Sequence, residues 1–244
     1  MNPPSCAMIV LRSVLFAVLQ TVLTVIFSLI ALLTFPFSAR IRYRTITLWN
    51  RIVVWLAEVV CGIRYRVIGL ENLPGTPTVV MAKHQSAWET IALPVLLPPM
   101  AMVIKRELLW VPFFGWGMAM LSPIAINRAE GRAALKQIVE QGRARMSEGF
   151  GVMIFPEGTR MAPGEIGRYG IGGAWLASHV NALVVPVAHN AGELWPKNSF
   201  LKHPGLITLS IGPAIDATGM KPDALNEQVK AWIETEMKQL QRHA

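Results

Sequence analysis

The first quarter of the chain is dominated by one long apolar run. From Ser13 to Ala39 the sequence contains 27 consecutive residues without a charge. A helix of that length extends about 40 Å, and about 20 residues are enough to cross the hydrocarbon core of a bilayer. A cleaved signal peptide has a shorter apolar stretch and a small-residue cleavage site, whereas Arg40, Arg42 and Arg44 follow this run. The pattern therefore predicts a membrane anchor that is retained.

The segment from Arg40 to Ile63 mixes arginines with apolar residues that include Trp49 and Trp55. This mixture predicts an amphipathic helix at the lipid interface, with tryptophan and arginine at headgroup level. Pro36 separates it from the apolar run, because proline cannot continue a helix without losing a hydrogen bond. Two geometries fit: a spanning helix followed by an interfacial helix, or a helical hairpin that dips into one leaflet. In both we expect the arginine cluster on the cytoplasmic side.

Beyond residue 63, short apolar runs alternate with longer amphipathic stretches. The runs predict strands at Tyr65–Ile68, Thr78–Ala82, Ala101–Ile104, Ile124–Ile126, Val152–Phe155, Leu183–Val187 and Leu206–Ile211. The stretches predict helices at Ala87–Leu96, Arg132–Ser147, Gly172–His179 and Asp223–Leu240. This alternation is typical of an α/β fold with a largely parallel sheet flanked by helices. We therefore expect an N-terminal two-helix membrane anchor at 1–63 and a second domain at 64–244, with ligands near the carboxyl ends of the strands.

The distribution of charge supports this division. The net charge is +8, yet residues 1–66 carry seven arginines and one acid, Glu58, which gives +6. The rest of the chain, with 16 basic and 14 acidic residues, is close to balanced. It has no RNA-binding signature and no zinc-finger spacing, so we expect no nucleic-acid partner. Two cysteines, Cys6 and Cys61, provide no disulfide framework, which is consistent with a reducing compartment.

The strand at Thr78–Ala82 is followed by candidate chemistry at His84 and Glu89. A histidine at the end of a strand can accept a proton at neutral pH, and a carboxylate on one ring nitrogen fixes its tautomer. Residues five apart on a regular helix lie about 140° apart, so the pair can meet only if His84 precedes the helix. Ser86 and Glu89 also form a capping-box pattern. The pairing of Glu89 with His84 and the capping of the helix by Ser86 and Glu89 do not exclude each other.

Further blocks follow in order along the chain. They are Lys105-Arg106-Glu107-Leu108-Leu109-Trp110-Val111-Pro112-Phe113-Phe114-Gly115, then Ile126-Asn127-Arg128, then Phe155-Pro156-Glu157-Gly158-Thr159-Arg160, then Val184-Val185-Pro186-Val187. Together with His84 they resemble the glycerolipid acyltransferase family, which includes 1-acylglycerol-3-phosphate acyltransferases. The family's hallmark is histidine, four residues, then aspartate, and here Glu89 stands in the aspartate position. The resemblance implies acyl transfer by residues 64–244 as the catalytic domain.

The resemblance also implies roles for individual residues. His84 is expected to deprotonate the acceptor hydroxyl while Glu89 orients it. The expected substrate-binding residues are Lys105, Arg128, Glu157, Gly158, Thr159 and Arg160, since arginine offers a donor fork that suits phosphate. The stretch from Leu108 to Met120 is expected either as a core or interfacial helix or as a wall of an acyl-chain tunnel. Gly170 occupies the place of a lysine in many relatives, and Arg168 lies beside it.

The expected reaction moves an acyl group from acyl-CoA or acyl-carrier protein, as co-substrate, to the 2-hydroxyl of 1-acyl-glycerol-3-phosphate (lysophosphatidate), giving phosphatidic acid. No metal-ligand motif occurs, so neither metal nor cofactor is expected. Membrane lipids are the expected partners, at the cytoplasmic (inner) membrane with the catalytic domain on its cytoplasmic face. One alternative is an acyltransferase acting on another lysophospholipid or an amino-acid lipid. A second alternative is a non-catalytic, membrane-anchored lipid-binding protein.

Overall fold

A computed structural model describes residues 4–242. Within them, eight strands form one sheet in the order β1-β7-β6-β2-β5-β3-β4, with β8 beside β6. The strands are β1 (Ile63–Ile68), β2 (Val79–Ala82), β3 (Met100–Lys105), β4 (Ile124–Ile126), β5 (Gly151–Ile154), β6 (Leu183–His189), β7 (Gly205–Ile211) and β8 (Ile215–Asp216). Only the pairings of β6 with β7 and with β8 are antiparallel, so the carboxyl ends of β2, β3, β4 and β5 share one edge.

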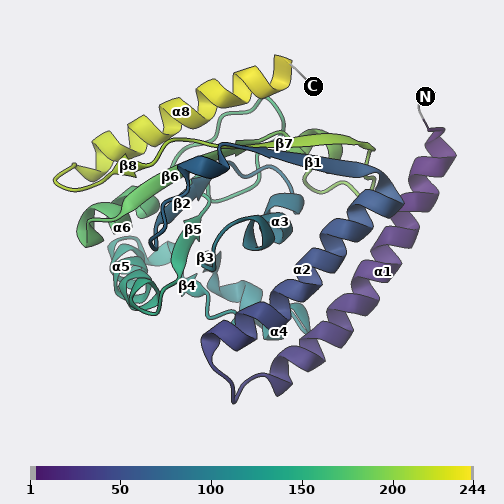
Figure 1. The fold of residues 1–244 in the computed structure, drawn as a ribbon, viewed down its shortest axis with the longest axis horizontal. Coiled ribbons are helices and arrows are strands. Elements are labelled where there is room, and N and C mark those ends of the chain that lie inside the picture. Colours follow the sequence, from purple (N-terminus) through teal and green to yellow (C-terminus); the bar gives the residue numbers. More distant parts are fainter. Residues whose placement is uncertain (1–3, 243–244) are drawn as a thin grey trace.

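Helices cover both faces of the sheet (Figure 1). They are α1 (Cys6–Leu33), α2 (Ala39–Cys61), α3 (Trp88–Leu96), α4 (Phe114–Met120), α5 (Arg132–Ser147), α6 (Gly172–Val180), α7 (Ala191–Leu194) and α8 (Pro222–Arg242). Short 3-10 turns occur at η1 (Leu70–Asn72), η2 (Arg106–Trp110) and η3 (Arg128–Glu130). The expected α/β class with a largely parallel, helix-flanked sheet is confirmed.

Alternate residues of the central strand β2 enter two separate cores. Val80 and Ala82 join a cluster with α2, α3 and α7, whereas Val79 and Met81 join a cluster with α5, α6 and α8. All four are fully buried. A strand covered on both faces has no polar face, which explains the continuous apolar run in its sequence. The sheet thus holds the residue that follows β2 between two packed layers.

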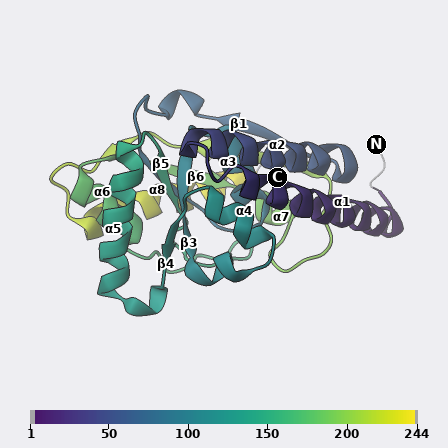
Figure 2. The same ribbon diagram turned by 90° about the horizontal axis from the view of Figure 1, so that it is seen from below.

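The N-terminal helices lie side by side along one flank, opposite α5 and α6 (Figures 1 and 2). Helix α2 buries Val53, Ala57 and Cys61 in the first core. Helix α1 packs against α2 and α4, and its Phe16 meets Trp195 edge-on with ring centroids 5.2 Å apart. Among residues 4–242, α1 alone has the length and composition to cross a membrane. Both predicted helices exist, and their role as an anchor stays a prediction.

The observed elements differ from those expected in a few places. The seven expected strands are present: the strand at Ile124–Ile126 has the expected bounds, and the ends of the others differ by at most two residues. The strand β8, only two residues long, was not expected. The stretch from Leu108 to Met120 forms the end of η2 and helix α4. Helix α2, expected at the lipid interface, presents one face to the protein core, because an apolar stripe can be buried by protein as well as by lipid.

Candidate active site

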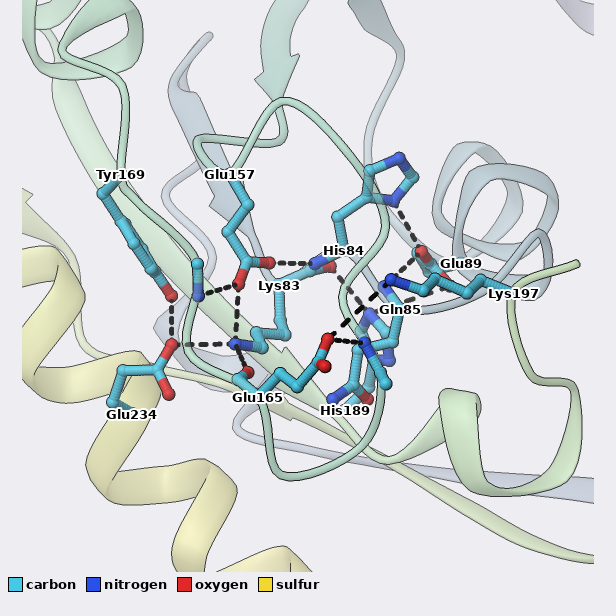
Figure 3. A network of polar contacts seen from close by, with 12 residues as sticks. Lys83, His84, Gln85, Glu89, Glu157, Glu165, Tyr169, His189, Lys197 and Glu234 are labelled. Atoms are coloured by element: carbon cyan, nitrogen blue, oxygen red, sulfur yellow. Dashed lines mark hydrogen bonds and ion pairs between the residues drawn. The ribbon is translucent and has the colours of Figure 1, made fainter.

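His84 and Glu89 meet at the carboxyl end of β2. His84 lies in the turn between β2 and α3, and Glu89 is the second residue of α3. Nδ1 of His84 lies 2.8 Å from Oε1 of Glu89 (Figure 3). Residues five apart can make this contact because His84 precedes the helix.

The same Glu89 oxygen also serves the start of the helix. Oε1 accepts hydrogen bonds from the backbone N–H groups of Gln85 (3.0 Å) and Ser86 (2.9 Å), while Ser86 Oγ accepts from the N–H of Trp88 at 3.0 Å. Burial favours a raised pKa for the Glu89 carboxyl, but the nearby histidines and these hydrogen bonds lower the pKa below its usual value. The carboxylate is therefore ionised, and capping and orientation of His84 occur together.

His84 is held on three further sides. Its backbone N–H donates to Oε2 of Glu157 at 2.9 Å, and its carbonyl accepts from the N–H of Met161 at 2.8 Å. The ring stacks on Phe155 with centroids 4.2 Å apart. Since the ionised Glu89 accepts a hydrogen bond from Nδ1–H, Nε2 carries the free lone pair. The side chain keeps 15% of its surface exposed, so this nitrogen can meet a substrate.

A second histidine, His189, lies behind this pair and is fully buried. Nε2–H donates to the carbonyl of Lys83 at 2.9 Å, and Nδ1 accepts from the N–H of Ala191 at 3.3 Å. Both bonds require the neutral ring, and burial lowers its pKa. Nε2 lies 3.9 Å from Oε2 of Glu89. His189 therefore has no nitrogen available to a substrate, and Oε2 of Glu89 stays buried without a hydrogen-bond partner within residues 4–242.

A cavity of about 600 Å³ opens in front of His84. One wall follows the strand ends and contains His84, Lys105, Arg128, Gly158, Thr159 and Arg160. We call it the polar wall. The other, which we call the helical wall, comes from α1, α2 and α4 and includes Gln20, Thr24, Phe27, Ser28, Ile46, Trp49, Phe114, Gly117 and Met118. The cavity thus joins a polar, basic rim to an apolar lining.

Arg128 and Gly158 connect two of the sequence blocks across the polar wall. A guanidinium N–H of Arg128 donates to the carbonyl of Gly158. Gly158 has φ +69°, and a Cβ there would lie 3.1 Å from the guanidinium, so glycine fits this position best. Nε of Arg160 is buried and has no hydrogen-bond partner within residues 4–242. Arg160 also lines the cavity, where its guanidinium can meet an anionic ligand.

The remaining expected residues differ in their surroundings. Lys105 is 55% exposed and lies 3.5 Å from Glu107. Glu157 is expected to contact substrate, but its side chain is buried and turned away from the cavity. Its Oε1 accepts from Lys83 Nζ at 2.7 Å, and Oε2 holds His84. Six expected residues therefore share the cavity, while Glu89 and Glu157 stand behind His84.

Gly170, which the family resemblance places at a lysine position, lies away from the cavity. Gly170 is exposed, and its N–H donates to the carbonyl of Pro156 at 2.7 Å. Two residues that the sequence motifs did not indicate, Lys197 and Asn198, line the cavity instead. Nζ of Lys197 lies 3.8 Å from Glu165. Both residues belong to a loop with no pattern of its own, so only their position in the fold identifies them.

Residues 64–190 match the acyltransferase family. The chain belongs to this family. It is 48% identical to the 1-acyl-sn-glycerol-3-phosphate acyltransferase of Pseudomonas aeruginosa over 84% of this chain and 80% of that one. Identity to the chloroplastic 1-acyl-sn-glycerol-3-phosphate acyltransferase of Arabidopsis thaliana is 28%, over 83% of this chain and 56% of the longer relative.

The fold of this acyltransferase also resembles a solved structure. The crystal structure of the 1-acyl-sn-glycerophosphate acyltransferase of Thermotoga maritima aligns with a TM-score of 0.79 over 95% of each chain, at 22% sequence identity. That alignment covers α1 and α2 as well as the sheet, since it extends over nearly the whole chain.

Proposed function

We propose that this acyltransferase moves a fatty acyl group from a thioester to the 2-hydroxyl of 1-acyl-glycerol-3-phosphate, giving phosphatidic acid. The observation that carries the proposal is His84, with a buried carboxylate on Nδ1, a free Nε2, and arginines on the same cavity wall. The relatives named above are 1-acyl-sn-glycerol-3-phosphate acyltransferases, which supports this acceptor. Phospholipid biosynthesis is the corresponding role.

The geometry supports a direct transfer. Nε2 of His84 accepts the proton of the acceptor hydroxyl as its oxygen bonds to the thioester carbon. The resulting tetrahedral intermediate collapses, the carbon–sulfur bond breaks, and the thiolate leaves with the proton that His84 returns. The Glu89 carboxylate stabilises the imidazolium between these steps. No acyl-enzyme is needed, because bringing both substrates together in one cavity supplies the rate advantage of proximity.

Phosphate recognition is assigned to Arg160, with Arg128 and Lys105 at the same wall. All three residues line the cavity beside His84, so a phosphate bound there meets cationic groups. A guanidinium fork matches phosphate oxygens. The terminal phosphate monoester of lysophosphatidate exposes more oxygens and more negative charge than a phosphodiester, which favours it over other lysophospholipids and over an amino-acid lipid. Thr159 adds an exposed hydroxyl, and Gly158 allows close approach of the backbone. This acceptor is therefore preferred over the other lysolipids considered above.

The donor is an acyl-CoA or an acyl-carrier protein, which present the same thioester to His84. The membrane side of the reaction is assigned to α1, whose outer face is apolar. Its exposed large side chains include Leu11, Val18, Val22, Ile26, Leu29 and Leu33. The inner face of α1 lines the cavity. We infer that α1 and α2 bind the inner membrane so that the cavity meets its cytoplasmic leaflet.

An acceptor screen tests the proposal. Purified protein receives a labelled acyl thioester, as CoA or carrier-protein ester, with lysophosphatidate, other lysophospholipids or an amino-acid lipid. We expect label in phosphatidic acid and a rate on lysophosphatidate above that on the other acceptors. A faster reaction on another acceptor would replace the acceptor assignment. No lysolipid-dependent loss of thioester would support the non-catalytic alternative.

Labelling of Cys6 tests the membrane geometry, since Cys6 is exposed and Cys61 is buried. An impermeant thiol reagent applied to sealed inner-membrane vesicles of either orientation is expected to modify Cys6 from the cytoplasmic side if α1 and α2 form a hairpin in one leaflet. Modification from the opposite side would show that α1 spans the bilayer.

A further inference from the structure

Behind His84, three segments of the chain meet in a buried polar network (Figure 3). Its centre is Lys83, the residue after β2. The ammonium group donates to Glu157 Oε1 at 2.7 Å, to Glu234 Oε1 at 2.9 Å and to the carbonyl of Glu165 at 3.1 Å. All three ammonium hydrogens have acceptors, so Lys83 is fixed in one geometry.

The charges in this network are almost completely removed from water. The side chains of Lys83 and Glu157 are 1% and 0% exposed, and that of Glu234 is 13% exposed. Tyr169 completes the set, because its hydroxyl donates to Glu234 Oε1 at 2.7 Å. Burial and the neighbouring Glu234 raise the pKa of Tyr169, so the hydroxyl stays protonated. A buried ion pair often adds little net stability compared with apolar side chains of similar shape. The network therefore calls for an explanation other than stability.

A continuous chain of hydrogen bonds connects the C-terminal helix to His84. Glu234 lies on α8, which covers the face of the sheet opposite α2 and α3. It holds Lys83, and Lys83 holds one oxygen of Glu157. The other oxygen of Glu157 accepts the backbone N–H of His84. One carboxylate therefore connects the ion pair directly to the backbone of His84.

We propose that Glu234 of α8 is a positioning residue for His84, acting through Lys83 and Glu157. Glu234 does not line the cavity and touches no substrate there. Its charge fixes Lys83 between two carboxylates. Lys83 then sets the orientation of Glu157, which in turn sets the position of the His84 backbone at the edge of the cavity. The proposal rests on the proposed function only because its kinetic readout is acyl transfer.

The Glu234→Gln variant tests the proposal. Glutamine keeps the size and an acceptor oxygen and removes the charge. We expect kcat to fall by between about tenfold and about a hundredfold, since misplacement of a catalytic group by an ångström has effects of this size. We expect KM for thioester and acceptor to stay unchanged, because the cavity lining is intact. Loss of stability alone would lower the amount of folded protein and leave kcat per folded molecule unchanged.

Glu227→Gln is the matched control. It removes the same charge from the same helix, about two turns earlier. The side chain of Glu227 is 72% exposed and contacts Lys230 at 4.0 Å, so we expect kcat and KM at the wild-type values. The Tyr169→Phe variant removes only the hydroxyl that holds Glu234 and is expected to lower kcat to a smaller degree. It carries the test if the Glu234 variant does not fold.

Hydrogen exchange provides a readout that does not depend on activity. We expect faster exchange in peptides covering 83–89 and 155–161 for Glu234→Gln, and wild-type exchange there for Glu227→Gln. Wild-type kcat and wild-type exchange at 83–89 in Glu234→Gln and Tyr169→Phe would overturn the proposal. If the wild type itself shows no acyl transfer, the proposed function fails, and the exchange experiment still decides the role of Glu234.

Discussion

The polar wall of the cavity offers cationic groups and the His84 ring to a substrate, whereas the helical wall is lined largely by apolar side chains. Behind the polar wall, Glu89 accepts three hydrogen bonds on one oxygen and so orients His84, and on the wall Arg128 donates to a backbone carbonyl. On the helical wall, Thr24 and Ser28 donate to carbonyls of their own helix. Their hydroxyls are thus already engaged by α1.

The two walls therefore affect different properties of the reaction, namely the rate of the chemical step and the choice of acyl chain. Directional bonds hold a reacting nitrogen at one position, which affects the rate of the chemical step. Packing sets the shape and volume available to an apolar chain, and a change of one methylene there costs about 1–3 kcal/mol of discrimination. Changes on the polar wall should therefore appear mainly in kcat or phosphate affinity, and changes on the helical wall mainly in the choice of acyl chain.

Replacing the base should have the largest effect. The His84→Ala variant is expected to lose at least about a thousandfold in kcat, because general base catalysis contributes up to about 10⁴-fold. Turnover of thioester with lysophosphatidate measures this, and circular dichroism checks that the variant is folded. Substantial remaining activity in a folded variant would exclude the mechanism proposed above.

The Glu89→Gln variant should follow, with kcat lower by about a hundredfold, since the amide is neutral and stabilises the imidazolium less well. Co-sedimentation with vesicles should be unchanged, because Glu89 is remote from the exposed face of α1. A fully active variant would mean that the carboxylate serves only to cap α3.

Arg160→Lys should weaken binding of the acceptor and leave the rate of the chemical step unchanged. A lysine replaces the fork by a point charge, and loss of one charge-assisted hydrogen bond, about 1.5 kcal/mol, corresponds to roughly a tenfold rise in KM for lysophosphatidate. Arg168→Lys is the matched control, because Arg168 is exposed and lies outside the cavity lining. Equal effects of both changes would argue against a phosphate site at Arg160.

Gly117→Leu should have the smallest effect and should act on the helical wall alone. A Cβ at Gly117 would lie 3.6 Å from Ser28 Oγ, so a larger side chain reduces the space between α4 and α1. We expect the ratio of kcat/KM for long-chain over short-chain thioesters to fall about three- to tenfold. An unchanged chain-length profile would place the acyl chain elsewhere.

The local sequence pattern was enough to predict the strands of the sheet and the pairing of His84 with Glu89. The apolar run of β2 and the capping pattern of Ser86 and Glu89 both depend on neighbours in sequence. The helical wall was harder, because an arginine-rich amphipathic segment such as α2 has the same pattern whether lipid or protein covers its apolar stripe.

Contacts between residues distant in the sequence could not be predicted from local patterns. Lys83 lies 74 residues from Glu157 and 151 residues from Glu234, and nothing in the local sequence of α8 distinguishes Glu234 from a solvated helix residue. The resemblance indicated Glu157 as a substrate ligand, and its buried pairing with Lys83 becomes visible only when the strands are assembled. Lys197 was missed for the same reason.

The participation of α1 in the cavity has a practical consequence for the division of the chain at residue 63. Gln20, Thr24, Phe27 and Ser28 form part of the lining, so a fragment starting at residue 64 would keep His84 and Glu89 but leave the cavity open to water on one side. If α1 binds the membrane as proposed, a lysolipid whose tail is embedded in the bilayer reaches His84 of the full chain by lateral diffusion within the leaflet, without leaving the lipid phase. The proposed membrane-binding segment would therefore also form part of the cavity in which the reaction takes place.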